Sequence, residues 1–520
     1  AGSGKSETMA ARLVWLVAND LVAPHRVLGL TFTRKAAAEL GQRIRARLAG
    51  LRRAGLLLDA AGLAADGAAA NGRAPSGAVP DSTGTDGTGT GPGGADMDGP
   101  LDGEPVVSTY HAYAARLVAD HALREAMEPS LRLITPAVSW QIAARVVATY
   151  GGPMDAVDRT PQWVTAAVLD LAAELSEHLR RPDDVGQASR WLDTASQALA
   201  GPVPSLVRKI RQCQRTREQL LPIVAAYTHA KAARDVMDYG DQVALAARIA
   251  TAHREVGAIE RARYQVVLLD EYQDTSHAQL VLLRALFSGG HPVTAVGDPC
   301  QSIYGWRGAS AGNLRRFAGD FPVSGTPGNG RPPGRPRPAR IKMLSTSFRN
   351  TENVLDAAAA LQAGLRAEAP LVPRLVPSPP RAGRGRVVCA LLETAAGEAE
   401  WVAAQVAGLL ALPPGIAPDG KPWPEPGRAG VRASDIAVLC RKRSQFPALR
   451  AAIEARSIPV EVVGLGGLLT VPEVADVVAT LRVLHDPAAS APLARLLTGP
   501  RWRIGPRDLV ALGRRARDLA

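Results

Sequence analysis

Two neighbouring carboxylates offer the clearest chemistry in this sequence. Asp270 and Glu271 directly follow the apolar run 266–269, which predicts a buried strand. Because ligands bind at the carboxyl ends of parallel strands, both side chains are expected at the ligand-binding edge of a sheet. There Asp270 can hold Mg²⁺, directly or through water, and Glu271 can orient and deprotonate an attacking water molecule. The alternative, an acidic pair that only caps the next helix, is weaker, because Asp274 or Ser276 can supply that cap.

The first residues of the chain form a glycine-rich segment of the kind that binds phosphate. The segment consists of Ala1, Gly2, Ser3, Gly4, Lys5 and Ser6. A helix-compatible stretch follows it. In such a loop, backbone N–H groups at a helix N-terminus surround phosphate oxygens. Lys5 would reach the β- and γ-phosphates of ATP, and the Ser6 hydroxyl would bind Mg²⁺. Alone, a Gly-Lys-Ser turn is a weak signal, because small turns of this kind are common.

Length and charge limit the class of protein. A chain of 520 residues is too long for one core and predicts about two to four domains. Its 61 Lys and Arg residues outnumber 49 Asp and Glu residues, which gives a net charge of +12. A surplus of this size favours a polyanionic partner, above all nucleic acid. The alternative explanation is a coding bias that prefers Arg to Lys.

The cysteines and apolar runs predict a compartment. Four cysteines lie far apart and form no CxxC pair, which argues against a zinc knuckle or an iron–sulfur site. This pattern suits a reducing environment, so we expect a cytoplasmic protein. No run of about 18 apolar residues predicts a membrane span. The N-terminus does not resemble a signal peptide and lacks Met, which indicates a truncated chain.

Strand-like and helix-like segments alternate along most of the chain. Short apolar runs predict buried strands at residues 27–31, 266–269, 293–296, 341–344, 387–391 and 436–439. Helical patterns separate them, and such alternation predicts an α/β fold with parallel sheets. Residues 112–235 instead predict a block of helices. Residues 61–105 and 322–340 are poor in residues that build a core, so both are expected to be disordered inserts.

Two longer strings carry a family resemblance. Residues 270–276, with the sequence DEYQDTS, resemble the Walker B box of superfamily 1 DNA helicases of the UvrD/Rep/PcrA/RecB type. Residues 297–309, with the sequence GDPCQSIYGWRGA, resemble motif III of the same family. Two boxes of this length in this order make a chance match improbable.

The resemblance implies roles for several residues around the nucleotide. Gln301 in motif III would sense the γ-phosphate and relay its state to the DNA site. Residues 345–351 resemble motif IV. By that match Phe348 would stack on adenine, where many relatives have Tyr, and Arg349 would be an arginine finger from the second motor domain.

The resemblance also implies a single-stranded DNA path. In motif III, bases could stack on the aromatic rings of Tyr304 and Trp306 and on the planar guanidinium group of Arg307. Residues 30–37 resemble motif Ia and residues 108–112 resemble motif Ib. The side chains expected to contact DNA from these two boxes are Thr31, Phe32, Thr33, Thr109 and His111. The alternative is structural: Phe32, Tyr304 and Trp306 would be core residues, and His111 would be a structural residue. His111 is assigned no catalytic role.

The family architecture predicts two RecA-like motor domains with helical accessory insertions. Motor domain 1A would comprise residues 1–111 and 236–321, and the helical block 112–235 would be accessory domain 1B. Residues 341–470 would be a partial motor domain 2A, and residues 471–520 the start of accessory domain 2B. Motifs V and VI would follow 2B, so the resemblance implies truncation at both ends.

The predicted activity is ATP- and Mg²⁺-dependent translocation on single-stranded DNA, in DNA repair or recombination. Family resemblance gives the direction 3′ to 5′ and adds single-strand/duplex junctions as substrates. The sequence of residues 4–19 and 238–242 resembles that of AdnB-like helicase–nuclease subunits, which implies a second subunit and a nuclease domain beyond residue 520. Two alternatives stay open. One is a catalytically incomplete single-stranded DNA-binding subunit, and the other is an unrelated P-loop enzyme such as a nucleotide kinase.

Overall fold

The computed structural model describes residues 2–55, 103–128, 131–157, 159–198, 203–305, 308–324, 335–368, 372–425, 427–463, 469 and 471–519. The predictions made for Ala1, Trp306 and Arg307, for most of the insert 61–105 and for the middle of 322–340 lie outside these residues. The chain forms two compact units, residues 1–350 with 358–378, and residues 351–357 with 379–520.

A parallel sheet forms the centre of the first unit. Its strands are β1 (Val27–Thr31), β2 (Val106–Thr109), β5 (Val266–Leu269) and β6 (Val293–Ala295), in the order β2-β1-β5-β6. Every residue of β1 and β5 is buried, as expected for strands covered on both faces. The strands predicted at 27–31 and 266–269 are confirmed, and the one at 293–296 is one residue shorter. The predicted α/β class is therefore correct for this unit.

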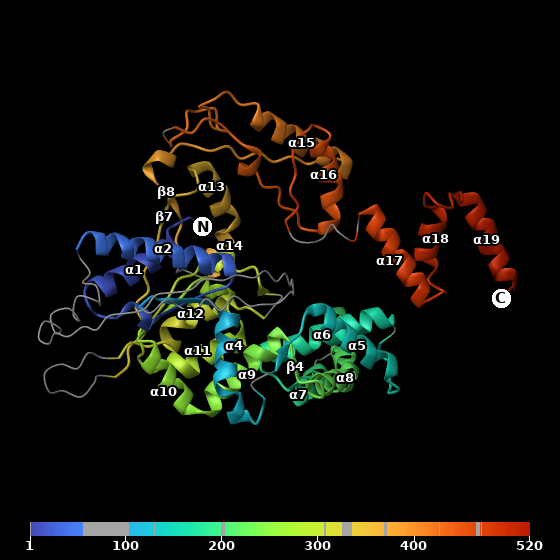
Figure 1. Ribbon diagram of the computed structural model, residues 1–520, viewed down its shortest axis with the longest axis horizontal. Helices are drawn as coiled ribbons and strands as arrows, with labels where there is room; N and C mark the ends of the chain where they lie inside the picture. The colour runs from blue at the N-terminus through green and yellow to red at the C-terminus, as the bar shows by residue number, and fades with distance from the viewer. Residues whose placement is uncertain are drawn as a thin grey trace, which may run out of the picture. The chain divides into compact units, whose positions relative to one another are not determined.

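Helices cover both faces of this sheet, and the strand residues divide between the two cores. Val27 and Leu268 pack with α1 (Lys5–Ala18) and α2 (Arg34–Arg53), while Leu28 and Leu269 pack on the opposite face. Such alternation follows from the pleat of a strand. The opposite face is covered by α4 (Tyr110–His121), α9 (Tyr239–Ala252), α10 (Arg254–Arg263) and α11 (His277–Phe287) (Figure 1). α12 (Ala311–Asp320) packs beside η3 (Tyr272–Asp274).

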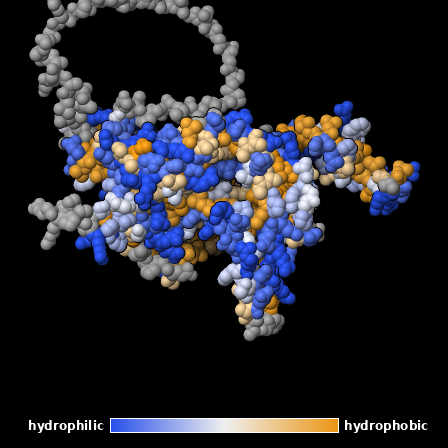
Figure 2. All heavy atoms as spheres, turned by 90° about the horizontal axis from the view of Figure 1, so that it is seen from below, coloured by the Kyte–Doolittle hydropathy of each residue, from blue (hydrophilic) through white to orange (hydrophobic). Residues whose placement is uncertain are grey.

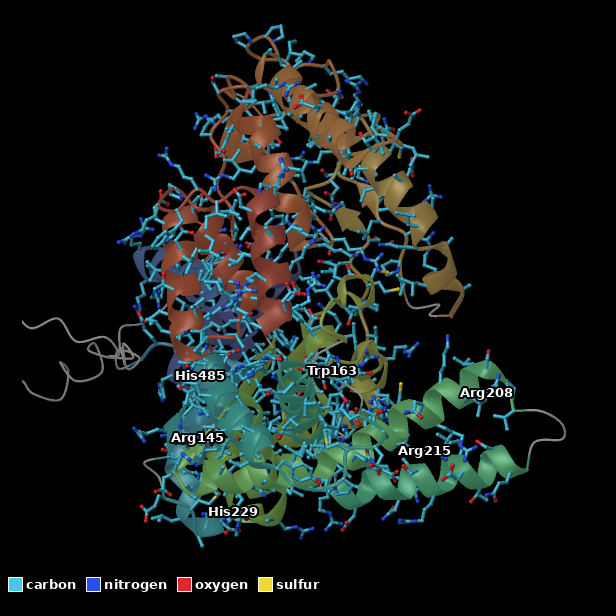
Figure 3. All side chains as sticks on the ribbon, turned by 90° about the vertical axis from the view of Figure 1, so that its right-hand side faces the viewer. Arg145, Trp163, Arg208, Arg215, His229 and His485 are labelled. Atoms are coloured by element: carbon cyan, nitrogen blue, oxygen red, sulfur yellow. The ribbon has the colours of Figure 1, made fainter. Side chains whose placement is uncertain are left out.

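A block of helices with its own core lies between α4 and α9 in the sequence. It contains β3 (Arg132–Leu133), α5 (Pro136–Thr149), α6 (Pro161–Glu177), α7 (Pro182–Gln197), α8 (Ser205–Ala232) and β4 (Val236–Met237). Thr135 and Thr160 cap α5 and α6, each followed by Pro at the first helical position. Arg208 and Arg215 lie along α8 with exposed side chains (Figure 3). α4 packs in the α/β core, and the buried residues of the separate helical core lie between Ile134 and Val236.

The remaining elements follow the first sheet in the chain. β7 (Thr346–Ser347) and β8 (Val376–Pro377) form a short parallel pair in the first unit, and α13 (Glu352–Leu361) and α14 (Ala363–Glu368) lie between them in sequence. The core of the second unit is formed by α15 (Ala395–Leu410) and α16 (Phe446–Glu454). Its last helices are α17 (Pro472–His485), α18 (Ser490–Thr498) and α19 (Pro506–Leu519). None of the described helices is both long and apolar enough to cross a membrane.

Three predicted strands are wrong. Residues 341–344, 387–391 and 436–439 are not strands in the described part of the chain. The side chains of Leu391 and Leu439 are 100% and 93% exposed, and hydrophobic residues are visible on the molecular surface (Figure 2). Apolar runs predict burial, but a strand also requires a hydrogen-bonded neighbour, which these segments do not have.

Candidate nucleotide site and nucleic-acid interface

The phosphate loop adopts a conformation that only glycine supplies without strain. Gly2 has a φ of +74° and Gly4 a φ of +81°, and α1 begins directly after them at Lys5. A Cβ on Gly2 would lie 2.5 Å from the Cβ of Arg349, so this position also requires a glycine for close approach. Gly4 has no side chain to cap α1. The first N–H groups of this helix therefore remain available for an anion.

The loop meets the carboxylate pair, as the sequence predicts. The Lys5 Nζ lies 3.6 Å from Glu271 Oε2. The Ser6 hydroxyl donates to Asp270 Oδ2 at 3.4 Å. A hydroxyl and a carboxylate oxygen at this separation are hard oxygen ligands of the type that Mg²⁺ prefers, so Ser6 and Asp270 fit a shared cation. Residues from the start of the chain and from the end of β5 thus form one cluster.

The peptide between Asp270 and Glu271 is held in an uncommon conformation. Glu271 has φ 46° and ψ 42°, the left-handed region, which costs a residue other than glycine about 1–2 kcal/mol. The Glu271 N–H donates to Asp270 Oδ1 at 3.0 Å. The carbonyl oxygen of Asp270 accepts from the Tyr110 hydroxyl at 3.1 Å. Burial, and then the charge of Glu271, raise the pKa of Asp270 above its ordinary value.

Gln273 connects the carboxylates to motif III and was missed by the sequence analysis. Its Nε2 donates to Glu271 Oε2 at 2.9 Å and to Asp274 Oδ2 at 3.2 Å. Its Oε1 accepts from the backbone N–H of Asp298 at 2.9 Å. The amide of a glutamine carries a donor and an acceptor, so it can donate to a carboxylate and accept from a backbone N–H at once. The signal was a glutamine among three acidic residues in the DEYQDTS string.

Gln301, the predicted sensor, belongs to the same network. Its Nε2 donates to Asp298 Oδ2, and its backbone N–H donates to the Asp298 carbonyl at 2.9 Å. Burial alone would raise the pKa of Asp298, but the hydrogen bond from Gln301 and the charge of Lys5 outweigh it and lower that pKa. The side chains of Gln301 and Glu271 are therefore linked through Asp298 and Gln273.

The predicted motif IV residues lie beside the phosphate loop in the first unit. The Phe348 N–H donates to the Gly2 carbonyl at 2.9 Å, directly after β7. Phe348 is 62% exposed. Arg349 is exposed and its Cβ is next to Gly2. The structure thus brings Phe348 and Arg349 to the same loop as Lys5.

An aromatic stack begins at the edge of this cluster. The Phe32 ring lies between two others, with its centroid 4.9 Å from Tyr110 and 6.2 Å from Tyr304. The rings of Phe32 and Tyr304 are nearly parallel, with an interplanar angle of 7°. Both are partly exposed, so neither is the fully buried core residue of the structural alternative.

The remaining residues predicted to contact DNA differ in burial and in their contacts within the protein. The Thr31 side chain is 1% exposed at the end of β1, because both faces of this sheet are covered, and its contact with DNA stays a prediction. The Thr33 and Thr109 side chains accept from backbone N–H groups as N-caps of α2 and α4. The His111 ring contacts the edge of Tyr239 at 5.9 Å. Tyr239 is 47% exposed, and its own side chain was not predicted to face DNA.

These features define a P-loop nucleotide-binding α/β protein. Its relatives narrow the class further: the chain belongs to the UvrD/REP helicase family. Residues 1–322 match the UvrD/REP helicase N-terminal domain, and residues 342–520 match the UvrD-like helicase C-terminal domain. This assignment agrees with two RecA-like motor domains.

Individual relatives are similar over nearly the whole chain. The ATP-dependent DNA helicase UvrD1 of Mycobacterium tuberculosis is 26% identical over 519 residues, 98% of this chain and 52% of that protein. DNA helicase II of Escherichia coli is 24% identical over 518 residues, 100% of this chain and 56% of that protein. The ATP-dependent DNA helicase PcrA of Leuconostoc citreum is 23% identical over 521 residues, 100% of this chain and 54% of that protein. The chain spans about half the length of these curated relatives.

Proposed function

We propose that this protein is an ATP-dependent DNA helicase that moves along single-stranded DNA. The observation that carries the proposal is the convergence of the phosphate loop with the carboxylate pair, Lys5 on Glu271 and Ser6 on Asp270. An aromatic stack that begins one residue beyond β1 adjoins this cluster, as a motor that couples nucleotide to DNA requires.

The roles of the first-unit residues follow from their positions. Lys5 and the backbone of Gly2, Ser3 and Gly4 bind the phosphates of ATP. Ser6 and Asp270 hold Mg²⁺, which neutralises phosphate charge when it is bound. Glu271, with one carboxylate oxygen held by Gln273, orients and deprotonates the attacking water.

Three further residues complete the proposed nucleotide site. Gln301 senses the γ-phosphate, because its partner Asp298 is also hydrogen-bonded to Gln273, which donates to Glu271. Arg349 stabilises charge on the γ-phosphate, and the exposed ring of Phe348 stacks on adenine.

The proposed DNA path follows exposed and partly exposed aromatic and hydroxyl side chains of the first unit. Phe32 and Tyr304 supply ring faces, and base stacking needs no particular sequence. Thr33, Thr109 and His111 line the same path, and Tyr239 extends it beside His111. By resemblance to the family, Trp306 and Arg307 also belong to this path. The same resemblance supports movement in the direction 3′ to 5′ and binding at single-strand/duplex junctions.

The finer assignments rest on resemblance. We propose motor domain 1A at residues 1–111 and 236–321, accessory domain 1B at 112–235, a partial 2A at 341–470 and the start of 2B at 471–520. A role in DNA repair or recombination and a cytoplasmic location belong to the same proposal. The lean towards an AdnB-like subunit, with a partner and a nuclease, stays a prediction that copurification and a nuclease assay of the whole protein would test.

The test of the proposed function uses the whole protein, ATP, Mg²⁺ and duplexes with either a 3′ or a 5′ single-stranded tail. We expect ATP hydrolysis stimulated by single-stranded DNA and strand displacement from the 3′-tailed duplex. DNA binding without hydrolysis would support the alternative of a catalytically incomplete DNA-binding subunit. Hydrolysis that DNA does not stimulate would contradict the motor.

A further inference from the structure

Tyr110 is a buried aromatic residue whose hydroxyl is used inside the site. It is the first residue of α4, and its side chain is 3% exposed. The hydroxyl donates to the main-chain oxygen of Asp270 at 3.1 Å. Burial, above all, raises the pKa of Tyr110 well above its ordinary value, so the hydroxyl remains a proton donor. Helix α4 is therefore fastened directly to the end of β5.

The oxygen that accepts this hydrogen bond belongs to an unusual peptide. It joins Asp270 to Glu271, whose φ of 46° is in the left-handed region. The N–H of the same peptide is held by Asp270 Oδ1. With both polar groups of the peptide engaged, its plane is fixed, and the direction of the Glu271 side chain is fixed with it. That carboxylate is the group that faces Lys5 and accepts from Gln273.

The ring of Tyr110 contacts the aromatic stack. Its centroid lies 4.9 Å from Phe32, and Phe32 stacks on Tyr304 at 6.2 Å. Tyr110 is thus in contact with the Asp270–Glu271 peptide through its hydroxyl and with the partly exposed Phe32 through its ring. A displacement of Phe32 by a bound base would change the packing of Tyr110.

We propose that Tyr110 is a positioning residue for Glu271, which transmits occupancy of the aromatic stack to the carboxylate that activates water. The inference rests on the proposed function and adds a residue to it. Without the hydroxyl, the strained peptide loses the donor that holds its carbonyl oxygen. Glu271 then spends less time in the orientation that hydrolysis requires, while the surfaces that bind ATP and DNA stay in place.

The same helix offers a matched control. Tyr113 is also buried, at 2% exposed, and its hydroxyl donates to Glu260 Oε2 at 2.7 Å. Glu260 is itself held by Arg116 at 2.6 Å, so this hydrogen bond belongs to a separate network. Tyr110→Phe and Tyr113→Phe remove the same atom from two positions three residues apart. Only the first removal reaches Glu271.

The experiment compares wild type, Tyr110→Phe and Tyr113→Phe in the full chain. The measurements are kcat and KM for ATP at saturating single-stranded DNA, the DNA dissociation constant, and the denaturant midpoint. For Tyr110→Phe we expect kcat to fall about two- to tenfold, the effect of one hydrogen bond, and DNA stimulation to fall with it. KM and the DNA dissociation constant should stay within about twofold of wild type. For Tyr113→Phe we expect a lower denaturant midpoint and an unchanged kcat.

The possible outcomes separate the two claims. DNA-stimulated turnover in wild type with an equal kcat in Tyr110→Phe would overturn the role of Tyr110 and leave the proposed function intact. An equal loss of kcat in both variants would also overturn it, because the loss would then follow stability. No turnover in wild type would overturn the proposed function and this inference together.

Discussion

Two lysine–carboxylate clusters in the first unit use the same residue types in opposite ways. Lys231 is surrounded by carboxylates, with its Nζ 2.6 Å from Asp238 Oδ2 and 2.5 Å from Asp241 Oδ2. Lys5 forms a longer ion pair, with its Nζ 3.6 Å from Glu271 Oε2. The two acids around Lys231 also cap α9 through each other's backbone N–H groups. The first cluster is saturated by the protein, and the second keeps its lysine available for a phosphate.

The electrostatics of the two clusters differ accordingly. Burial alone would lower the pKa of Lys231, but Asp241 and Asp238 outweigh it and raise that pKa. Its contribution to stability is therefore fully present at neutral pH and is lost only as pH rises through the raised pKa. Around Asp270 burial and the charge of Glu271 raise the pKa of the acid, so the folded protein disfavours its ionised form. The charge of Lys5 and the hydrogen bond from Ser6 lower the pKa of Asp270 without reversing this effect, so this carboxylate is a candidate ligand-binding group.

The sharpest comparison replaces each lysine with methionine. Lys231→Met should lower the free energy of unfolding by about 3–5 kcal/mol, because two partly buried carboxylates lose the buried lysine that is their shared counter-charge. Lys5→Met should change it by less than about 1 kcal/mol and instead abolish nucleotide binding. Denaturant titrations and equilibrium binding of a labelled nucleotide measure both quantities.

Lys209→Met is the control for this pair, because Lys209 is an exposed lysine on the same helix as Lys231. It should change the free energy of unfolding by less than about 0.5 kcal/mol. If Lys5→Met destabilised the protein as much as Lys231→Met, the distinction between an open and a saturated cluster would be lost.

A smaller effect is expected from pH. The folded-state pKa of Asp270 is raised, so its ionisation costs stability above that pKa, and acidification from neutral pH recovers this cost. Burial alone would raise the pKa of Asp238, but Lys231 outweighs burial and lowers that pKa. Asp238 therefore stabilises the fold above its ordinary pKa, and this contribution is lost as the pH falls through the lowered pKa. At pH 7, Asp270→Asn should therefore raise the denaturant midpoint and Asp238→Asn should lower it. Shifts of the same sign in both variants would be incompatible with this account.

Much of the first unit could be predicted from its sequence. The strands at 27–31 and 266–269 are continuous apolar runs, which is the pattern of strands buried on both faces. The approach of Ser6 to Asp270 agrees with the assignment of both residues to Mg²⁺. These predictions succeeded because local pattern and topology determine them.

Other features depend on contacts that no local pattern specifies. The left-handed conformation of Glu271 is tied to a hydrogen bond from Tyr110, far away in the sequence. The amide of Gln273 connects two motifs only because β5 and β6 are adjacent in the sheet. The apolar run 436–439 resembled a strand in composition, yet pairing needs a neighbour that composition does not predict.

The most direct test of the central claim is ATP hydrolysis by the full-length protein and its Glu271→Gln variant, with and without single-stranded DNA. The account predicts strong stimulation of wild type by DNA. In the variant, kcat should fall about 10²- to 10⁴-fold while ATP and DNA still bind, because glutamine keeps the shape of the side chain but cannot accept the proton. An unchanged kcat in Glu271→Gln would contradict the account, because the carboxylate facing Lys5 would then not be the group that activates water.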